Sequence, residues 1–228
     1  ASYQVDNPIV VPFGFFANND ASQPVPVDNI SRLMAVNIFT GKVANWNELD
    51  ADYPNLPIVV CHRHAGSGTV ATFNAAVLRG VADMPTVQRD GMQTSPYGNY
   101  DVHQGYLSSI FFNKGSSDAA KCAGKHLGAI AYADSDKCVN GCIDPETNEG
   151  KYGDVKAIAY QGVGGDSNTD KMSEAIKNGR HIFWAAQYLY SNETPDGPED
   201  SVIDGLVDFA ELDANMPTKR ADFWAAQG

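Results

Sequence analysis

The residues best suited to chemistry lie in one short segment, where a glycine-containing turn follows an apolar run. In order, the segment reads Val59, Val60, Cys61, His62, Arg63, His64, Ala65, Gly66, Ser67, Gly68 and Thr69. A guanidinium offers a planar fork of hydrogen-bond donors that matches the edge of a phosphate or a carboxylate. With two hydroxyls nearby, this composition predicts an oxyanion-binding segment.

The spacing predicts that a strand, a turn and the first turn of a helix follow one another here. The start of a helix leaves several backbone N–H groups unpaired and carries about half a positive charge. Glycines at positions 66 and 68 let the main chain approach a ligand, because they have no Cβ atom. We therefore expect an anion site at a helix N-terminus, formed by Arg63, Gly66, Ser67, Gly68 and Thr69.

Two alternatives apply to the same segment. The turn could be purely structural, with Ser67 or Thr69 as the helix cap and no ligand. His62 and His64 flank the arginine, and His64, as an accessory ligand, would make binding pH-dependent. The simpler expectation for both histidines is that they are exposed polar loop residues. No lysine follows the last glycine, so the segment is not a Walker A loop.

Composition and charge limit the classes of partner. The chain has 228 residues, 43% of them hydrophobic and 19% charged, as in ordinary soluble globular proteins of one or two domains. The formal net charge of −12 argues against nucleic acid or an anionic membrane surface as a partner. It does not argue against a small anion, which a few local donors can hold. No apolar run reaches the roughly 18 residues of a membrane span.

The four cysteines allow three complete pairings. Cys138 and Cys142 flank an Asn-Gly turn, which predicts a small disulfide loop in an oxidising compartment. Cys122 is a competing partner for either, and Cys61, after an apolar run, is expected as a buried free thiol or a structural bridge. No CxxC pair or nearby histidine cluster provides a tetrahedral set, so we predict no metal site. The CxxCH motif is also missing, so we predict no covalent haem, and we expect no other cofactor.

Short apolar runs alternate with amphipathic stretches along the chain, a pattern typical of an α/β protein. The predicted strands cover residues 8–16, 57–61, 127–132, 155–160 and 182–190. The predicted helices cover residues 28–41, 67–79, 171–177, 202–212 and 219–226. The first helix would be capped by Asp28 or Asn29 and would bury Leu33, and residues 138–153 would form an exposed excursion.

Four groups of residues, in order along the chain and including the segment around Arg63, carry a resemblance to a known family. They are Asn37-Ile38-Phe39-Thr40-Gly41-Lys42 with Trp46-Asn47-Glu48-Leu49, then residues 63–69, then Gly128-Ala129-Ile130-Ala131-Tyr132, then residues 176–181 with Leu189-Tyr190. Together they resemble the phosphate-binding proteins of bacterial ABC-type phosphate uptake. The resemblance implies an α/β, periplasmic-binding-protein-like fold of two lobes, with mixed sheets flanked by helices.

The resemblance also implies roles for particular residues. In that family one lobe contributes Arg, Ser, Gly and Thr to the ligand, and these roles fall on Arg63, Ser67, Gly68 and Thr69. Ala65 stands where the family often has an acidic residue. The family's other lobe contributes an early hydroxyl-bearing loop and an aspartate that accepts a proton from phosphate. Both lie upstream of the strand matched by residues 9–16, so we expect one lobe to be incomplete here.

These observations lead to one main functional hypothesis and one alternative. The main one is a periplasmic or extracellular solute-binding protein, not an enzyme, that captures phosphate or a similar oxyanion for an ABC permease. Residues 9–160 would form the site-bearing lobe, and residues 161–228 with 1–8 a partial second lobe. A partner chain, a further segment or self-association would cover the incomplete lobe. The alternative is a structural or interaction protein that reuses the fold in an extracellular assembly.

Overall fold

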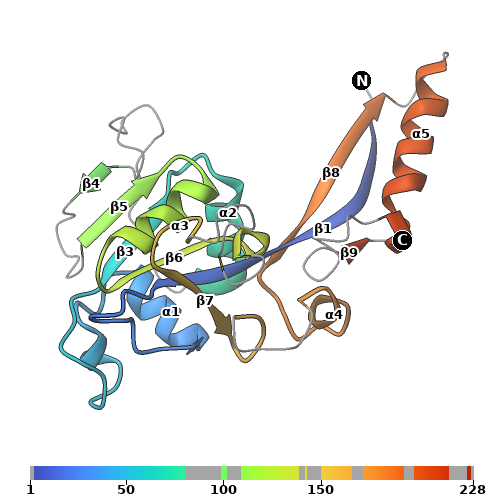
Figure 1. The fold of residues 1–228 in the computed structure, drawn as a ribbon. Helices are drawn as coiled ribbons and strands as arrows, with labels where there is room; N and C mark the ends of the chain where they lie inside the picture. The colour runs from blue at the N-terminus through green and yellow to red at the C-terminus, as the bar shows by residue number, and fades with distance from the viewer. Residues whose placement is uncertain are drawn as a thin grey trace. The chain divides into compact units, whose positions relative to one another are not determined.

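The computed structural model describes residues 3–80, 99–101, 109–138, 142, 150–165, 172–192, 198–215 and 225–226. These residues form two compact units (Figure 1). One unit comprises Phe13–Thr169, and we call it the central unit. The other comprises Ala1–Pro12 and Asp170–Gly228, and we call it the terminal unit. The long strand β1 (Tyr3–Asn18) contributes residues to both.

The central unit is built on a mixed sheet. In spatial order its strands are β2 (Asn29–Ile30), β7 (Val155–Tyr160), β1, β6 (Ala129–Asp134), β3 (Val59–Arg63), β5 (Ser109–Asn113) and β4 (Asn99–Asp101). β3 runs parallel to both β5 and β6, whereas β1 is antiparallel to β6 and β7. The carboxyl ends of β3, β5 and β6 therefore meet at one edge of the sheet, which is where open α/β sheets bind ligands.

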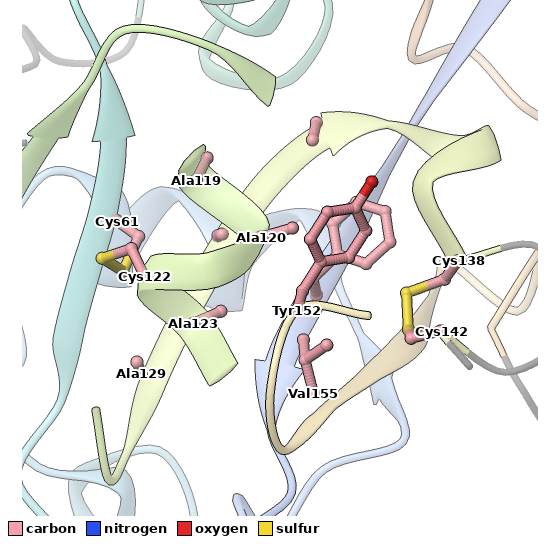
Figure 2. Close-up of a cluster of buried hydrophobic side chains, with 13 residues drawn as sticks. Cys61, Ala119, Ala120, Cys122, Ala123, Ala129, Cys138, Cys142, Tyr152 and Val155 are labelled. Atoms are coloured by element: carbon pink, nitrogen blue, oxygen red, sulfur yellow. A yellow bond between two sulfur atoms is a disulfide. The ribbon is translucent and has the colours of Figure 1, made fainter. Parts of the chain in front are cut away.

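Helix α3 (Ser116–Lys125) covers one face of this sheet by packing on β6, β3, β5 and β7. The contact is close because the facing side chains are small: alanines at 119, 120 and 123 on the helix meet alanines at 129, 131 and 133 on β6 (Figure 2). Gly124 lies so close to the main chain of Tyr152 that a Cβ atom there would clash with its carbonyl oxygen. The small residues thus fix the distance between helix and sheet.

The opposite face of the sheet carries aromatic side chains, because side chains alternate along each strand. They pack against α1 (Arg32–Phe39) and α2 (Gly68–Phe73). Phe73 stacks on Tyr132 with ring centroids 4.4 Å apart, and Phe39 meets Phe73 edge-on at 5.0 Å. Phe15, Phe39, Phe73 and Tyr132 are all fully buried, so this layer is the main aromatic core of the central unit.

Two disulfides belong to the same buried cluster as the alanines of α3 and β6. Cys138 pairs with Cys142, which confirms the predicted small loop (Figure 2). Cys61 pairs with Cys122, so it forms a structural bridge and is not a free thiol. The expectation of an exposed excursion over 138–153 is wrong for Cys138, Cys142 and Tyr152, which are buried in the core. Residues 139–141 and 143–149 lie outside the described part of the chain.

The first helix starts later than the sequence pattern predicts. Its N-cap is Ser31, whose hydroxyl accepts a hydrogen bond from the Met34 amide at 3.1 Å. Asn29–Ile30 instead pairs with β7 as strand β2, so neither Asp28 nor Asn29 caps the helix. Leu33, expected on the inner face, is 69% exposed. The pairing of β2 takes the apolar Ile30 out of the helix, and the buried face of α1 shifts accordingly.

The second predicted helix, residues 67–79, is present with an irregular second half. α2 continues into a π-helical turn (Asn74–Leu78) and ends at Arg79, whose φ of 53° is left-handed. Val70, Phe73 and Val77 are its buried residues along with Thr69 and Leu78. Further along the chain, residues 99–101 form strand β4, and residues 81–98 lie outside the described part.

In the terminal unit, residues 3–12 of β1 pair antiparallel with β8 (Trp184–Asn192), and β9 (Ala225–Ala226) pairs with Ile9 and Val10. Helices α4 (Met172–Lys177) and α5 (Pro198–Ala210) belong to the same unit. The helix expected over 219–226 is wrong for its last two residues, which form β9; residues 216–224 lie outside the described part. Among the described helices, none has the length and apolar character required to cross a bilayer.

Candidate functional site

Arg63 is the last residue of β3, so its side chain leaves the sheet at the edge where three parallel strands end. One terminal nitrogen, Nη1, donates to Ser116 Oγ at 2.7 Å and to Thr69 Oγ1 at 3.3 Å. The other, Nη2, donates to the Lys114 carbonyl oxygen at 3.0 Å. The Nε atom is buried and has no hydrogen-bond partner. The guanidinium is therefore held at its far end and unsatisfied on its inner side.

Ser67 occupies the N-cap position of α2 without acting as a side-chain cap. Its backbone is extended, with φ −85° and ψ 128°, as a cap residue requires, but its hydroxyl makes no capping hydrogen bond. The residue is only 6% exposed, and its Oγ atom is buried without a partner. Thr69 is also buried, and its hydroxyl contacts Arg63. A capping role thus accounts for neither hydroxyl.

The two glycines of the turn differ in their surroundings. A Cβ atom at Gly68 would meet nothing within 4 Å, so the main chain there is open. A Cβ atom at Gly66 would lie 3.3 Å from the His64 ring. The Gly66 amide already donates to His64 Nδ1 at 3.2 Å. Gly68 therefore presents accessible backbone, whereas the N–H of Gly66 is used within the turn.

The expectation that His62 and His64 are exposed is wrong for both residues. His62 is 1% exposed, because β3 extends past Cys61 and alternation turns this side chain onto the aromatic face. Its Nε2 lies 3.2 Å from the Phe39 carbonyl oxygen and its Nδ1 3.1 Å from the Tyr132 hydroxyl. Since a carbonyl only accepts, we assign the proton to Nε2 and a hydrogen bond from Tyr132 to Nδ1. His64 is 9% exposed, beneath the Gly66 turn.

Arg63 carries its charge without a contacting carboxylate among the described residues. No ion pair between these residues includes it, and its three acceptors are neutral oxygens. Burial lowers the pKa of Arg63, while the charges of Asp134, Tyr132 and Asp118 act to raise it. An arginine stays protonated at neutral pH even so. A partly buried cation of this kind is stabilised by an anion that contacts it.

The sequence patterns did not identify Lys114 or Ser116, because neither β5 nor α3 was predicted. A signal for them exists in the run Ile110-Phe111-Phe112-Asn113-Lys114-Gly115-Ser116. It repeats the order of the first segment: apolar strand, glycine turn, then a serine at the start of a helix. The Gly115 amide donates to Asp118 Oδ2 at 3.1 Å, which closes the N-terminus of α3. Among the described residues, no group of three His, Cys, Asp or Glu side chains is arranged to hold a metal ion.

Comparison with known proteins identifies the superfamily to which this architecture belongs. Residues 9–212, most of the chain, match the PBP superfamily domain. The chain belongs to the PBP superfamily. Membership agrees with the mixed sheet, the flanking helices and the division into two units. The periplasmic-binding-protein-like fold class predicted from the ordered motifs is thereby confirmed.

Solved structures with the same fold come from several bacteria. A protein of Clostridium perfringens, described as a phosphate ABC transporter substrate-binding protein with bound phosphate, is 17% identical over 99% of this chain and 72% of its own, with a TM-score of 0.62. PstS of Borrelia burgdorferi is 12% identical over 98% of this chain and 72% of its own, with a TM-score of 0.58. An ABC-type phosphate transport receptor of Vibrio cholerae is 14% identical over 93% of this chain and 68% of its own, with a TM-score of 0.55. At these identities the likeness establishes the fold.

Proposed function

We propose that this PBP superfamily protein is an extracytoplasmic solute-binding protein that captures phosphate or a similar oxyanion for an ABC permease, and is not an enzyme. One observation carries the proposal: Arg63 Nε and Ser67 Oγ are buried donors without partners, on either side of one turn. Phosphate-binding proteins among the similar structures support the choice of ligand. The two disulfides suit an oxidising compartment outside the cytoplasm.

Neither donor has a hydrogen-bond partner within the protein. A buried polar group without a hydrogen bond costs about 1–3 kcal/mol, and more when it is charged. An oxyanion between Arg63 Nε and the Ser67 hydroxyl would satisfy both groups at once. It would also provide the counter-charge that the guanidinium lacks among the described residues. Binding would thus remove a cost that the fold already bears.

Within this proposal the residues of the turn have different roles. Arg63, Ser67 and Thr69 contact the anion with their side chains, and Gly68 with its open main chain. Gly66 and His64 hold the turn in shape through the bond from the Gly66 amide to His64 Nδ1. The central unit is the site-bearing lobe in this view, and the terminal unit is part of a second lobe.

The direct test is isothermal titration calorimetry of the purified chain with inorganic phosphate, with sulfate and chloride in parallel. We expect a dissociation constant for phosphate of about 1 μM or tighter, equivalent to about −8 kcal/mol. Chloride, which cannot bridge several donors, should give no measurable heat. The absence of heat with phosphate and with sulfate would contradict the proposal.

We further propose that another polypeptide covers the terminal unit. On α5, Val202, Leu206 and Phe209 recur at helical spacing and are all exposed, and Tyr188 and Tyr190 are exposed on β8. Exposed apolar residues grouped in this way mark interaction surfaces. Residues 198–215 contain six acidic residues and neither Lys nor Arg, so like charges oppose a second copy there.

A partner segment with apolar and basic side chains fits the exposed apolar and acidic surface of α5 best, whether it comes from the same precursor or from another chain. Light scattering of the native protein, with the intact mass of every component, tests the idea. We expect a copurifying chain or additional residues of the same polypeptide. A compact, fully folded monomer of these 228 residues alone would refute it.

A further inference from the structure

Ser116 approaches the candidate site from a different element than Arg63, Ser67 and Thr69. It is the first residue of α3 and follows β5, the parallel neighbour of β3. Its Oγ atom accepts a hydrogen bond from Arg63 Nη1 at 2.7 Å, the shortest of the three that the guanidinium donates. Ser116 is 53 positions away from Arg63 in sequence, so only the fold brings the two together.

The direction of this hydrogen bond determines whether the Ser116 hydroxyl can still donate to a ligand. A guanidinium has only donors, so Ser116 Oγ must act as the acceptor. The hydrogen of the Ser116 hydroxyl then remains to be donated, and no described residue accepts it. Thr69 is in the same position, since its hydroxyl also accepts from Nη1. A positive donor strengthens the hydrogen bond that such a hydroxyl donates in turn.

The geometry points to Ser116 as a further ligand: we propose that its hydroxyl donates to the same oxyanion that Arg63, Ser67 and Thr69 bind. The inference rests on the proposed function and extends it to a second loop. Two segments of the same design, each a parallel strand followed by a glycine turn and a helix, would then hold one anion from two sides. The guanidinium between them fixes both hydroxyls.

This arrangement also indicates the chemical class of ligand. Arg63 Nε and the hydroxyls of Ser67, Thr69 and Ser116 all act as donors toward the ligand. A donor set needs several unprotonated oxygens arranged around one centre. A tetrahedral oxyanion provides them, whereas a halide lacks the separated acceptors. The ligand expected at this edge of the sheet is therefore a tetrahedral oxyanion that presents unprotonated oxygens.

The test compares three variants by calorimetry with inorganic phosphate. Ser116→Ala removes the hydroxyl, Ser116→Thr keeps it, and Ser117→Ala is the matched control on the next residue of α3. Loss of a hydrogen bond to a charged ligand should weaken binding by about tenfold in Ser116→Ala. Ser116→Thr and Ser117→Ala should bind within about threefold of the wild type. Circular dichroism and melting curves verify that each variant is folded.

A double-mutant cycle separates direct donation from an effect exerted through the arginine. If Ser116 contacts the anion, Ser116→Ala still weakens phosphate binding in an Arg63→Lys background. If the effect of Ser116→Ala disappears there, the serine only positions Arg63, and the inference is overturned. Phosphate binding by the wild type that Ser116→Ala leaves unchanged overturns the inference but not the proposed function. A wild type that binds neither phosphate nor sulfate overturns both.

Discussion

Cys61 and Cys122 are joined by a disulfide that connects the two elements bearing the site. Cys61 lies in β3, two residues before Arg63, and Cys122 lies in α3, the helix that begins with Ser116. The Cα atoms of the pair are 6.0 Å apart, so helix and strand are held close at this point (Figure 2). The bridge therefore supports the hydrogen bond from Arg63 to Ser116 at the end of the same two elements.

Removal of this disulfide should destabilise the protein more than removal of the other one. The Cys61–Cys122 bridge has a sequence separation of 61, and the chain-entropy relation for such a loop gives about 4 kcal/mol. The Cys138–Cys142 bridge has a separation of 4, which gives about 2 kcal/mol. Guanidinium-induced unfolding of the two double Cys→Ala variants measures the difference. Equal losses for the two variants would contradict the prediction.

The hydrogen bond from Tyr132 to His62 should contribute to the stability of the fold. Tyr132→Phe removes the hydroxyl and leaves His62 Nδ1 without this partner in a fully buried aromatic layer. The expected cost is about 1–3 kcal/mol of unfolding free energy, measured by chemical denaturation. Tyr190→Phe is the matched control, because Tyr190 is 65% exposed, and it should change stability by less than about 0.5 kcal/mol. A Tyr132→Phe variant as stable as the control would rule out the assigned hydrogen bond as a stabilising one.

The sequence predicted the strand, turn and helix around Arg63 because the signals there are local. An apolar run, two glycines and an amphipathic helix follow one another within about twenty residues, and the structure forms β3, the turn and α2 in that order. The fold class followed from four ordered motifs. A hydrogen bond in the core joins two of these motifs, since the Trp46 indole donates to the Gly128 carbonyl oxygen at 3.0 Å.

Other features could not be predicted from the sequence, because they depend on contacts between residues that are distant in sequence. α3 has a buried face of alanine, cysteine and glycine, so its apolar pattern is weak, and Ser116 was missed with it. The apolar run ends at Cys61, so the sequence pattern predicts that His62 lies in a loop. Pairing with Asn113 and Phe112 of β5 carries β3 on to Arg63 and buries the histidine. The pairing of β2 with β7 likewise overrode the predicted start of α1.

His126 predicts a pH dependence of stability. Burial lowers the pKa of His126 below its ordinary value of 6.5, and the neighbouring Lys125 lowers it further. The unfolded chain thus binds a proton more readily than the folded one. Stability should fall as the pH decreases from about 7.5 to about 5.5, because protonation then favours unfolding.

His126→Phe is the appropriate comparison, because it retains a ring to stack on Phe111, whose centroid lies 4.3 Å from that of His126. Denaturation curves at several pH values should show a smaller pH slope for this variant than for the wild type. An unchanged slope would mean that other groups account for the loss of stability in acid.

The open space beside Gly68 predicts that a variant at this position folds normally but binds phosphate poorly. A Cβ atom there meets nothing within 4 Å, so Gly68→Ala should leave stability unchanged within about 1 kcal/mol or raise it slightly. The added methyl would lie at the helix start where the anion contacts the main chain, so phosphate affinity should fall by about tenfold. Gly205→Ala on α5, also open, is the control, with no effect on affinity. Unchanged phosphate affinity in Gly68→Ala would exclude this main-chain contact.

The central claim is that Arg63 holds an oxyanion at the carboxyl edge of the sheet, and calorimetry of Arg63→Met with inorganic phosphate tests it most directly. Met keeps much of the volume but none of the donors, and loss of a buried charge need not destabilise the fold. Arg79→Met, at an exposed arginine, is the control. We predict that the wild type and Arg79→Met bind phosphate, and that Arg63→Met binds about 100-fold more weakly or not at all. Equal affinities of Arg63→Met and the wild type would contradict the account.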